Sequence, residues 1–381
     1  MTTVFCDASD RPRMHALVVG VGTYRYLKDG DPPSTLWPWR NLGQLTCPPR
    51  SAEAVGRWLL RNQIRDPDKP LGSLEMVASP SLRLGTQRDG RPGIDIDVEA
   101  ATFEHFQESF DRWYKRCNAN TGNVSFFYFS GHGIQTDTLA LLLEDAGKNP
   151  LRFFDEAFDF DGLYDGMAQC KASVQCYFVD ACRTHPATEE WQMVRPRQLI
   201  QSKFQLLYRD APKIFSTGNG QLAYGTPGEC TEFTKALLTA LDGCGAERSP
   251  QGTWRVTTDS IGWAIRQLLE RDTQPPAPFQ NGGGARGGAI RTLPGAPTVP
   301  FRLGYQPEEA LAIACMQLVE GVSQRVEAKR DTPECRVWES GIRADKYDLK
   351  ATFGGCRFRD SRTPVWMLPP YVDQYFEAEN A

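Results

Sequence analysis

Two patterns of hydrophobic and polar positions alternate along the first 270 residues. Short apolar runs rich in aromatic and β-branched residues predict buried strands over residues 15–24, 73–79, 123–133, 138–145, 175–185 and 211–221. Apolar residues at helical spacing predict helices over residues 51–63, 98–117 and 229–241. Strands that alternate with helices in this way indicate an α/β fold with a mostly parallel sheet covered on both faces.

Local signals add detail to this outline. Ser51 is in position to cap the first predicted helix. The helix over residues 98–117 carries one aromatic face, made of Phe103, Phe106, Phe110, Trp113 and Tyr114. Residues 80–93 are polar and contain Gly, Pro and Arg, which predicts a loop.

A change of composition marks the end of this region. Residues 271–300 are dense in Pro and Gly, and we expect a linker or loop there. The chain then divides into a domain over residues 13–270, the linker, and a small C-terminal module of unknown type over residues 301–381.

Composition narrows the range of partners. The 381 residues carry a net charge of −4, which gives no reason to expect nucleic acid or an anionic membrane as a partner. No segment has the roughly 18 consecutive apolar residues of a membrane span. The 11 cysteines are scattered and include no CxxC pair. A disulfide framework or zinc site is therefore not expected, and a reducing cytoplasm is the predicted location.

Two reactive side chains follow predicted strands. His132 comes directly after the run "NVSFFYFSG", and Cys182 comes after "QCYFVDA". Functional groups of open α/β sheets gather at the carboxyl ends of the strands. An imidazole near a thiol can take its proton, which makes the thiol a nucleophile. Each residue alone would usually be structural, but both together indicate nucleophilic catalysis, with the flanking glycines leaving room for a substrate backbone.

These motifs resemble the caspase-like cysteine peptidases, the superfamily of caspases, metacaspases, paracaspases and bacterial relatives. The caspase signature is Q-A-C-[RQG]-G with a histidine about 50 residues upstream. This chain has "DACRT" at residues 180–184, so the first and last positions differ, and the D-x-C form is closer to metacaspases. "VGVGTY", "SAEAVGRWLL" and "STGNGQLAYGTPGECTEFTKALL" extend the resemblance over roughly residues 13–269.

The resemblance implies a three-layer α/β/α sandwich with a six-stranded core sheet and a His/Cys dyad. Cys182 would attack the peptide carbonyl, and His132 would protonate the leaving amine and activate water. The backbone N–H groups of Gly133 and Cys182 would bind the oxyanion. No metal and no organic cofactor is implied. Some metacaspases respond to calcium, but the acidic tract over residues 141–162 is predicted to be a solvated loop.

Specificity also follows from the resemblance. Asp180 and Ser130 match positions of the pocket that holds the substrate side chain before the scissile bond. A carboxylate there favours Arg over Lys, because a guanidinium pairs with it through two hydrogen bonds. Arg50, just before the first predicted helix, is a candidate to neutralise Asp180, so acidic specificity stays open as an alternative.

The resemblance further implies protein substrates and a zymogen cut by an upstream protease or by itself, in a bacterial defence or stress pathway. Arg195 and Arg197, or the group Arg83, Arg88 and Arg91, are candidate cleavage sites. A catalytically silent signalling or scaffold protein is the second hypothesis, against which both His132 and Cys182 are present. A phosphate-binding protein is disfavoured because neither GxGxxG nor GxxxxGK[ST] occurs. The oligomeric state stays open.

Overall fold

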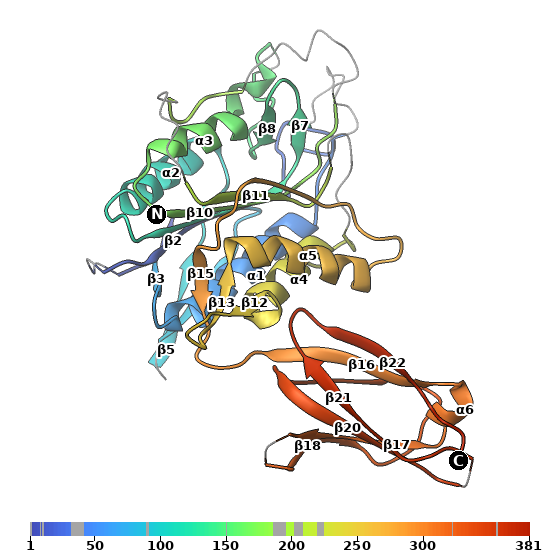
Figure 1. Ribbon diagram of the computed structural model, residues 1–381. Coiled ribbons are helices and arrows are strands. Elements are labelled where there is room, and N and C mark those ends of the chain that lie inside the picture. Colours follow the sequence, from blue (N-terminus) through green and yellow to red (C-terminus); the bar gives the residue numbers. More distant parts are fainter. Residues whose placement is uncertain are drawn as a thin grey trace. The chain divides into compact units, whose positions relative to one another are not determined.

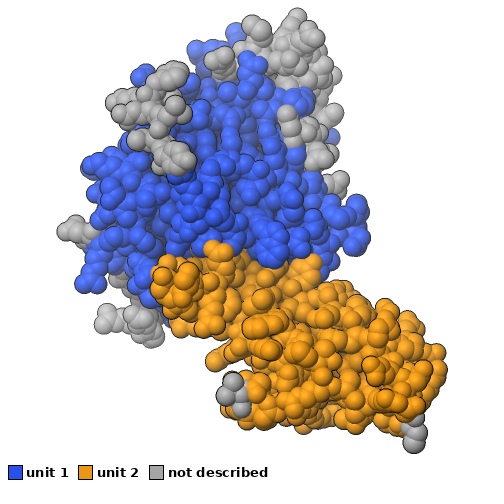
Figure 2. Space-filling model, viewed as in Figure 1, with its two compact units in different colours: residues 1–238, 257–292 blue, residues 239–256, 293–381 orange. Residues whose placement is uncertain are grey.

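The computed structural model describes residues 2–7, 9, 11–31, 42–88, 91–149, 151–185, 196–201, 209–218, 225–321, 323–355 and 357–381. The chain forms two compact units, which Figure 2 distinguishes by colour. Unit 1 comprises residues 1–238 and 257–292, and unit 2 comprises residues 239–256 and 293–381. Unit 2 thus takes in a segment upstream of the predicted C-terminal module.

A mostly parallel sheet forms the centre of unit 1 (Figure 1). In spatial order its strands are β1 (Thr3–Cys6), β3 (Leu71–Ser79), β2 (Met14–Val21), β6 (Val124–Gly131), β10 (Val174–Ala181), β11 (Ala211–Phe215) and β14 (Gln280–Gly284). The five inner strands are parallel and the two edge strands are antiparallel to their neighbours. The predicted α/β class is confirmed, and the described sheet has seven strands where the resemblance implied six.

Helices cover both faces of this sheet. In Figure 1, α2 (Phe103–Cys117) and α3 (Phe160–Gly166) lie on one side, and α1 (Cys47–Arg61), α4 (Glu232–Thr239) and α5 (Thr258–Asp272) on the other. The predicted aromatic face of α2 packs into a core with alternate side chains of the central strands, among them Phe127 and Phe129. Alternation along the strands places Phe126 and Tyr128 on the opposite face.

The starts of two helices differ from the prediction. α1 begins at Cys47, before the predicted Ser51, because Pro48 and Pro49 occupy its first turn, where a missing N–H costs nothing. Ser51 does not cap the helix, and its Oγ instead accepts a hydrogen bond from the Thr231 N–H at 3.1 Å. α2 begins at Phe103, and the side chain of Thr102 caps it by accepting from the His105 N–H.

Residues 80–93, predicted as a loop, are mostly hairpin. β4 (Arg83–Arg88) pairs antiparallel with β5 (Arg91–Asp97). Leu84 on β4 is fully buried, and the Arg83 Nε lies 2.5 Å from the Asp97 Oδ1 across the hairpin. The prediction was wrong because burial of Leu84 and backbone pairing of the two strands outweigh the turn-forming composition.

Residues 271–300, expected to be a linker or loop, contain β14, β15 (Ala289–Thr292) and the start of β16 (Thr298–Gln306). The glycines of β14 add an edge strand to the main sheet through backbone hydrogen bonds alone. Gly283 has φ +79°, and a Cβ there would lie 2.3 Å from the Ala211 carbonyl oxygen. Only glycine allows this close approach, so the glycine-rich composition serves strand pairing at this point.

Unit 2 is mainly β-structure. One sheet has the order β19 (Trp338–Arg343), β16, β22 (Val372–Glu377), and the other β18 (Val326–Arg330), β17 (Ala314–Glu320), β20 (Asp345–Phe353), β21 (Ser361–Met367). Inward side chains of both sheets, including Leu303, Tyr305, Met316 and Leu349, share one core. The short helix α6 (Glu308–Leu311) follows β16, and β12 (Ala246–Arg248) pairs with β13 (Trp254–Thr257).

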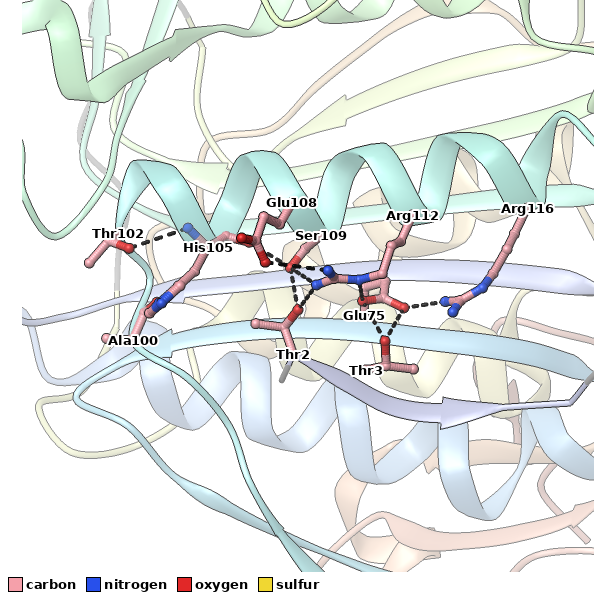
Figure 3. A network of polar contacts seen from close by, with 10 residues as sticks. All are labelled: Thr2, Thr3, Glu75, Ala100, Thr102, His105, Glu108, Ser109, Arg112 and Arg116. Carbon is pink, nitrogen blue, oxygen red and sulfur yellow. Dashed lines mark hydrogen bonds and ion pairs between the residues drawn. The ribbon is translucent and has the colours of Figure 1, made fainter.

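A polar network joins the N-terminal strand β1 to β3 and α2 (Figure 3). Glu75 on β3 has a fully buried side chain, and its carboxylate binds the guanidinium groups of Arg112 and Arg116 on α2. Thr3 on β1 donates its hydroxyl to the same carboxylate at 2.8 Å. One buried anion therefore joins two strands and a helix.

Candidate active site

Strand register brings His132 and Cys182 to the same place. β6 and β10 are parallel neighbours, with Ser130 opposite Asp180 and Gly131 opposite Ala181. His132 and Cys182 are the next residue on each strand, and neighbouring strands lie about 4.8 Å apart. The same offset continues beyond them, because Ile134 forms a bridge with Thr184 and the Gln135 N–H donates to the Thr184 carbonyl at 2.9 Å. The two chains thus run side by side through both residues.

The glycines around His132 are required by the protein's own packing. A Cβ on Gly133 would lie 2.4 Å from the carbonyl oxygen of Cys182, and one on Gly131 would lie 2.7 Å from the Tyr24 hydroxyl. Neither contact is possible for a real side chain. We expected these two glycines to leave room for a substrate. Atoms of the protein itself already occupy the space beside them.

His132 is held as a neutral base. Its side chain is buried, and Nε2 lies 2.8 Å from the carbonyl oxygen of Gly43. A carbonyl can only accept, so Nε2 carries the hydrogen and Nδ1 keeps a bare lone pair. Among the described residues, Nδ1 has no hydrogen-bond partner. Burial lowers the pKa of His132, and the hydrogen bond to Gly43 opposes this only in part.

Tyr24 contacts the same histidine through its hydroxyl and its ring, and it was not predicted as a site residue. Its hydroxyl accepts a hydrogen bond from the His132 N–H at 2.7 Å, and the two rings are 4.7 Å apart. Burial raises the pKa of Tyr24, so its hydroxyl stays protonated. The residue closes the motif "VGVGTY" just after β2, but nothing in the local sequence distinguishes it from a core tyrosine.

Cys182 directly follows β10 and is half-buried. The chain around it is fixed on both sides, since the Thr217 hydroxyl donates to the Ala181 carbonyl at 2.9 Å. Arg183 donates to the Gln135 Oε1 through Nε at 3.1 Å and Nη2 at 2.8 Å, and its guanidinium lies over the Phe215 ring. The residues on either side of Cys182 are thus held by hydrogen bonds and ring contacts.

Asp180 lies in a buried cluster of polar side chains beside this pair. Hydroxyl groups from three residues donate to its Oδ2, namely Thr231, Thr234 at 3.0 Å and Tyr128 at 3.4 Å. Burial raises the pKa of Asp180, and the hydroxyl donors oppose that rise. The two threonines come from the start of α4, which the sequence identified as a helix without assigning it a role in the site.

Three polar atoms of this cluster lack a hydrogen bond of good geometry. Within the described parts of the chain, the Asp180 Oδ1, the Ser130 Oγ and the Ser216 Oγ form no hydrogen bond that meets the usual geometry. All three residues are buried. Unpaired buried polar groups are costly, so their clustering marks a place suited to a ligand with several donors. Ser216 was not predicted from the sequence.

Arg50 does not neutralise Asp180 in this structure. Its side chain is 63% exposed, and its Nη1 lies 3.4 Å from the Glu53 Oε2 on the same helix. The partners of the Asp180 carboxylate are the hydroxyl groups named above. The sequence left open that Arg50 neutralises Asp180, and the contacts of both side chains show that it does not.

The acidic tract over residues 141–162 is folded, not a solvated loop. It contains β8 (Leu139–Leu142) in part, β9 (Ala157–Asp159) and the start of α3. The Asp145 Oδ1 accepts from the Phe103 N–H, and the Asp159 Oδ1 from the Gly162 N–H, so both carboxylates cap helices. Within the described residues, no group of three or more His, Cys, Asp or Glu side chains is arranged to hold a metal ion.

Comparison with known families agrees with this arrangement. The sequence model of the caspase domain, peptidase family C14, matches residues 86–335, which include His132, Asp180 and Cys182. The match covers well over half of the chain. The protein therefore belongs to the caspase-domain family of cysteine peptidases.

Individual relatives are more distant. An uncharacterized protein of Sinorhizobium fredii, y4kE, is 28% identical over 235 residues, which is 57% of this chain and 67% of its own. Among solved structures, caspase-1 from Spodoptera frugiperda matches with a TM-score of 0.42 and 10% identity, covering 77% of this chain and 97% of its own. No helix in the described part of the chain is long and apolar enough to cross a membrane.

Proposed function

We propose that the protein is a cysteine endopeptidase in which Cys182 is the nucleophile and His132 the base. The observation that carries this proposal is the unpaired, buried Nδ1 of His132 on the strand beside Cys182. Nδ1 takes the thiol proton, and the thiolate attacks the scissile carbonyl carbon. Collapse of the tetrahedral intermediate breaks the C–N bond, and the imidazolium returns the proton to the leaving amine. Water, deprotonated by Nδ1, then hydrolyses the thioester.

The oxyanion formed in each step needs hydrogen-bond donors. We assign this role to the backbone N–H groups of Gly133 and Cys182. The tight contact between Gly133 and the Cys182 carbonyl supports this assignment, because it fixes the two backbones against each other before substrate binds. Donors that need no reorganisation stabilise charge in a transition state most effectively.

Substrate preference is assigned to Asp180, with Arg favoured over Lys before the scissile bond. The open Oδ1 and the unpaired hydroxyls of Ser130 and Ser216 together offer acceptors to a guanidinium, which has five N–H donors in a rigid plane. An ammonium group is more compact and reaches fewer acceptors at once. A buried carboxylate disfavours an acidic side chain at the same place.

Fluorogenic peptides ending in Arg, Lys or Asp test the activity and the preference together. We expect turnover of the Arg peptide by the wild-type protein and none by Cys182→Ala. Turnover of the Asp peptide alone would retain the peptidase and refute the assigned pocket. If no peptide is cleaved even after trace treatment with an activating protease, the proposed activity is wrong.

We further propose that the protein is a cytoplasmic zymogen that is cut by itself or by an upstream protease. It would act in a bacterial defence or stress pathway. Arg195 lies outside the described residues. Arg197 is a poor cleavage site, because its N–H donates to Ala157 and its carbonyl accepts from Asp159. Mass spectrometry of an active preparation should therefore find no cut after Arg197. A dominant cut there would contradict this.

A further inference from the structure

We infer that Gln44 is a positioning residue, whose side-chain amide fixes the two groups that orient His132. This inference rests on the proposed role of His132 as the base. Gln44 stands outside the motifs that carry the family resemblance and outside the residues matched by the family model. What assigns it a role is a closed circuit of hydrogen bonds in this structure.

The circuit begins at the side chain of Gln44. Its Oε1 accepts from the Tyr24 N–H at 2.7 Å, and its Nε2 donates to the Tyr24 carbonyl at 3.0 Å. The same Nε2 donates to the Lys28 carbonyl at 2.8 Å. The Gln44 amide thus forms hydrogen bonds with both backbone groups of Tyr24 and with the Lys28 carbonyl in the turn that follows Tyr24. Two flanking contacts, from the Leu45 N–H to the Gly22 carbonyl at 2.8 Å and from the Lys28 N–H to the Leu42 carbonyl at 3.2 Å, hold the same segment antiparallel to this turn.

The circuit closes at His132 from two directions. Tyr24, held by Gln44, presents its hydroxyl to the His132 N–H and its ring to the imidazole. Gly43, the residue before Gln44, presents its carbonyl to the His132 Nε2. Moving Gln44 therefore disturbs the backbone contact and the ring contact of His132 together. No other side chain in the described residues forms hydrogen bonds that connect Tyr24 with the segment containing Gly43.

The chemical consequence concerns the tautomer. A free neutral imidazole populates both tautomers, and only the one with hydrogen on Nε2 leaves Nδ1 able to take the thiol proton. The Gly43 carbonyl selects that tautomer, and Gln44 keeps the carbonyl in place. A positioning residue of this kind affects the chemical step and leaves substrate binding unchanged.

The substitution Gln44→Met tests this without opening a cavity, because Gln44 is exposed and methionine has a similar length. It removes the acceptor and the donor together. Gln169→Met is the matched control: the Gln169 amide also donates to a backbone carbonyl, that of Gln201 at 3.0 Å. Gln169 precedes β10, at the end of the strand opposite to Cys182.

The first readout is the tautomer itself, measured by ¹⁵N-imidazole NMR on histidine-labelled protein above the pKa of His132. Only 4 histidines are present, and His132→Ala identifies the signal. We expect the wild type and Gln169→Met to hold hydrogen on Nε2, and Gln44→Met to shift toward a mixture. A tautomer population unchanged in Gln44→Met would overturn the inference.

The second readout is kinetic. In Gln44→Met we expect kcat to fall about tenfold, with KM nearly unchanged. The acid limb of the pH profile should move to lower pH, because the Gly43 hydrogen bond that raises the pKa of His132 is weakened. A rise in KM alone would refute the positioning role.

The two proposals fail separately. If the wild type shows no Cys182-dependent cleavage, the peptidase proposal is wrong, and the NMR comparison still decides the role of Gln44. If cleavage is present and Gln44→Met behaves like Gln169→Met in both readouts, the inference is wrong and the peptidase proposal stands.

Discussion

His132 combines burial with one hydrogen bond, and these two features set its protonation. Burial disfavours the charged imidazolium more than the Gly43 carbonyl favours it, so the pKa lies below the ordinary value of 6.5. The residue is then neutral at physiological pH. A base in this state is ready to accept a proton without first losing one.

A pH dependence follows for the proposed peptidase. Below the pKa of His132 the imidazole is protonated and cannot take the thiol proton, so kcat/KM should rise with pH and reach half its plateau below pH 6.5. Measurement of kcat/KM on an Arg peptide between acid and neutral pH checks this. An acid limb centred clearly above 6.5 would show that the imidazole is not the buried, neutral group described here.

Asp180 permits a second prediction at the residue scale. Asp180→Asn keeps the shape of the side chain and removes its charge, so kcat/KM on an Arg peptide should fall roughly 10- to 100-fold. The thermal stability should not fall, because burial already disfavours the charged carboxylate. A peptide with citrulline, the neutral isostere of Arg, serves as the control substrate. If the preference for Arg over citrulline is the same in both proteins, Asp180 does not set the specificity.

The sequence allowed part of this site to be predicted. His132 and Cys182 stand beside each other because strand ends in a parallel sheet meet at one edge, and their positions directly after predicted strands indicated this. Tyr24, Gly43 and Gln44 could not be found, because their roles depend on backbone groups brought together by folding. Thr231 and Thr234 left a weak signal, since two threonines three residues apart share one face of a helix.

At the scale of elements, β1, β3 and α2 depend on one buried carboxylate. Glu75 receives Arg112, Arg116 and Thr3, as Figure 3 shows, and its side chain has no exposed surface. The two guanidinium groups remain partly exposed, at 32% and 25%. The charge is thus compensated by groups that keep contact with water, which lowers the desolvation cost of the pair.

Glu75→Gln should therefore destabilise unit 1. The loss of a buried, doubly paired carboxylate leaves Arg116 without its anion and Arg112 with only the Glu108 carboxylate, whose Oε2 lies 3.4 Å from its Nη1. It should lower the free energy of unfolding by about 2–3 kcal/mol. Urea denaturation measures this. Arg83→Met, which removes an ion pair exposed by more than 70% on both sides, is the control and should change the value by less than about 0.5 kcal/mol. Equal effects would mean that burial of Glu75 does not matter.

Elements with strong patterns were predicted, and elements defined by pairing were not. The central strands and α2 follow from buried runs and an aromatic face. The hairpin of β4 and β5 and the edge strand β14 were read as loops, because Gly, Pro and Arg dominate their composition. Their strand conformation depends on pairing: β4 and β5 pair with each other, and β14 pairs with β11, which is distant in sequence.

At the scale of the whole molecule, two compact units are seen (Figure 2). The proposed chemistry lies entirely in unit 1, where His132, Cys182, Asp180 and Gln44 are all found. Unit 2 has its own core between two sheets. Its strands alternate buried with less buried positions, as in β17. That alternation was available in the sequence, but without a motif it did not identify the type of the predicted C-terminal module.

The most direct test of the central claim is covalent labelling with a peptidyl-arginyl chloromethyl ketone, followed by peptide mapping. The reagent needs a nucleophilic thiol, a working histidine and a pocket for Arg in one place. We predict a single adduct on Cys182 in the wild type, a strongly slowed reaction in His132→Ala and in Asp180→Asn, and no adduct in Cys182→Ala. Labelling spread over other cysteines, or labelling of Cys182 at the same rate in all variants that retain it, would contradict the account.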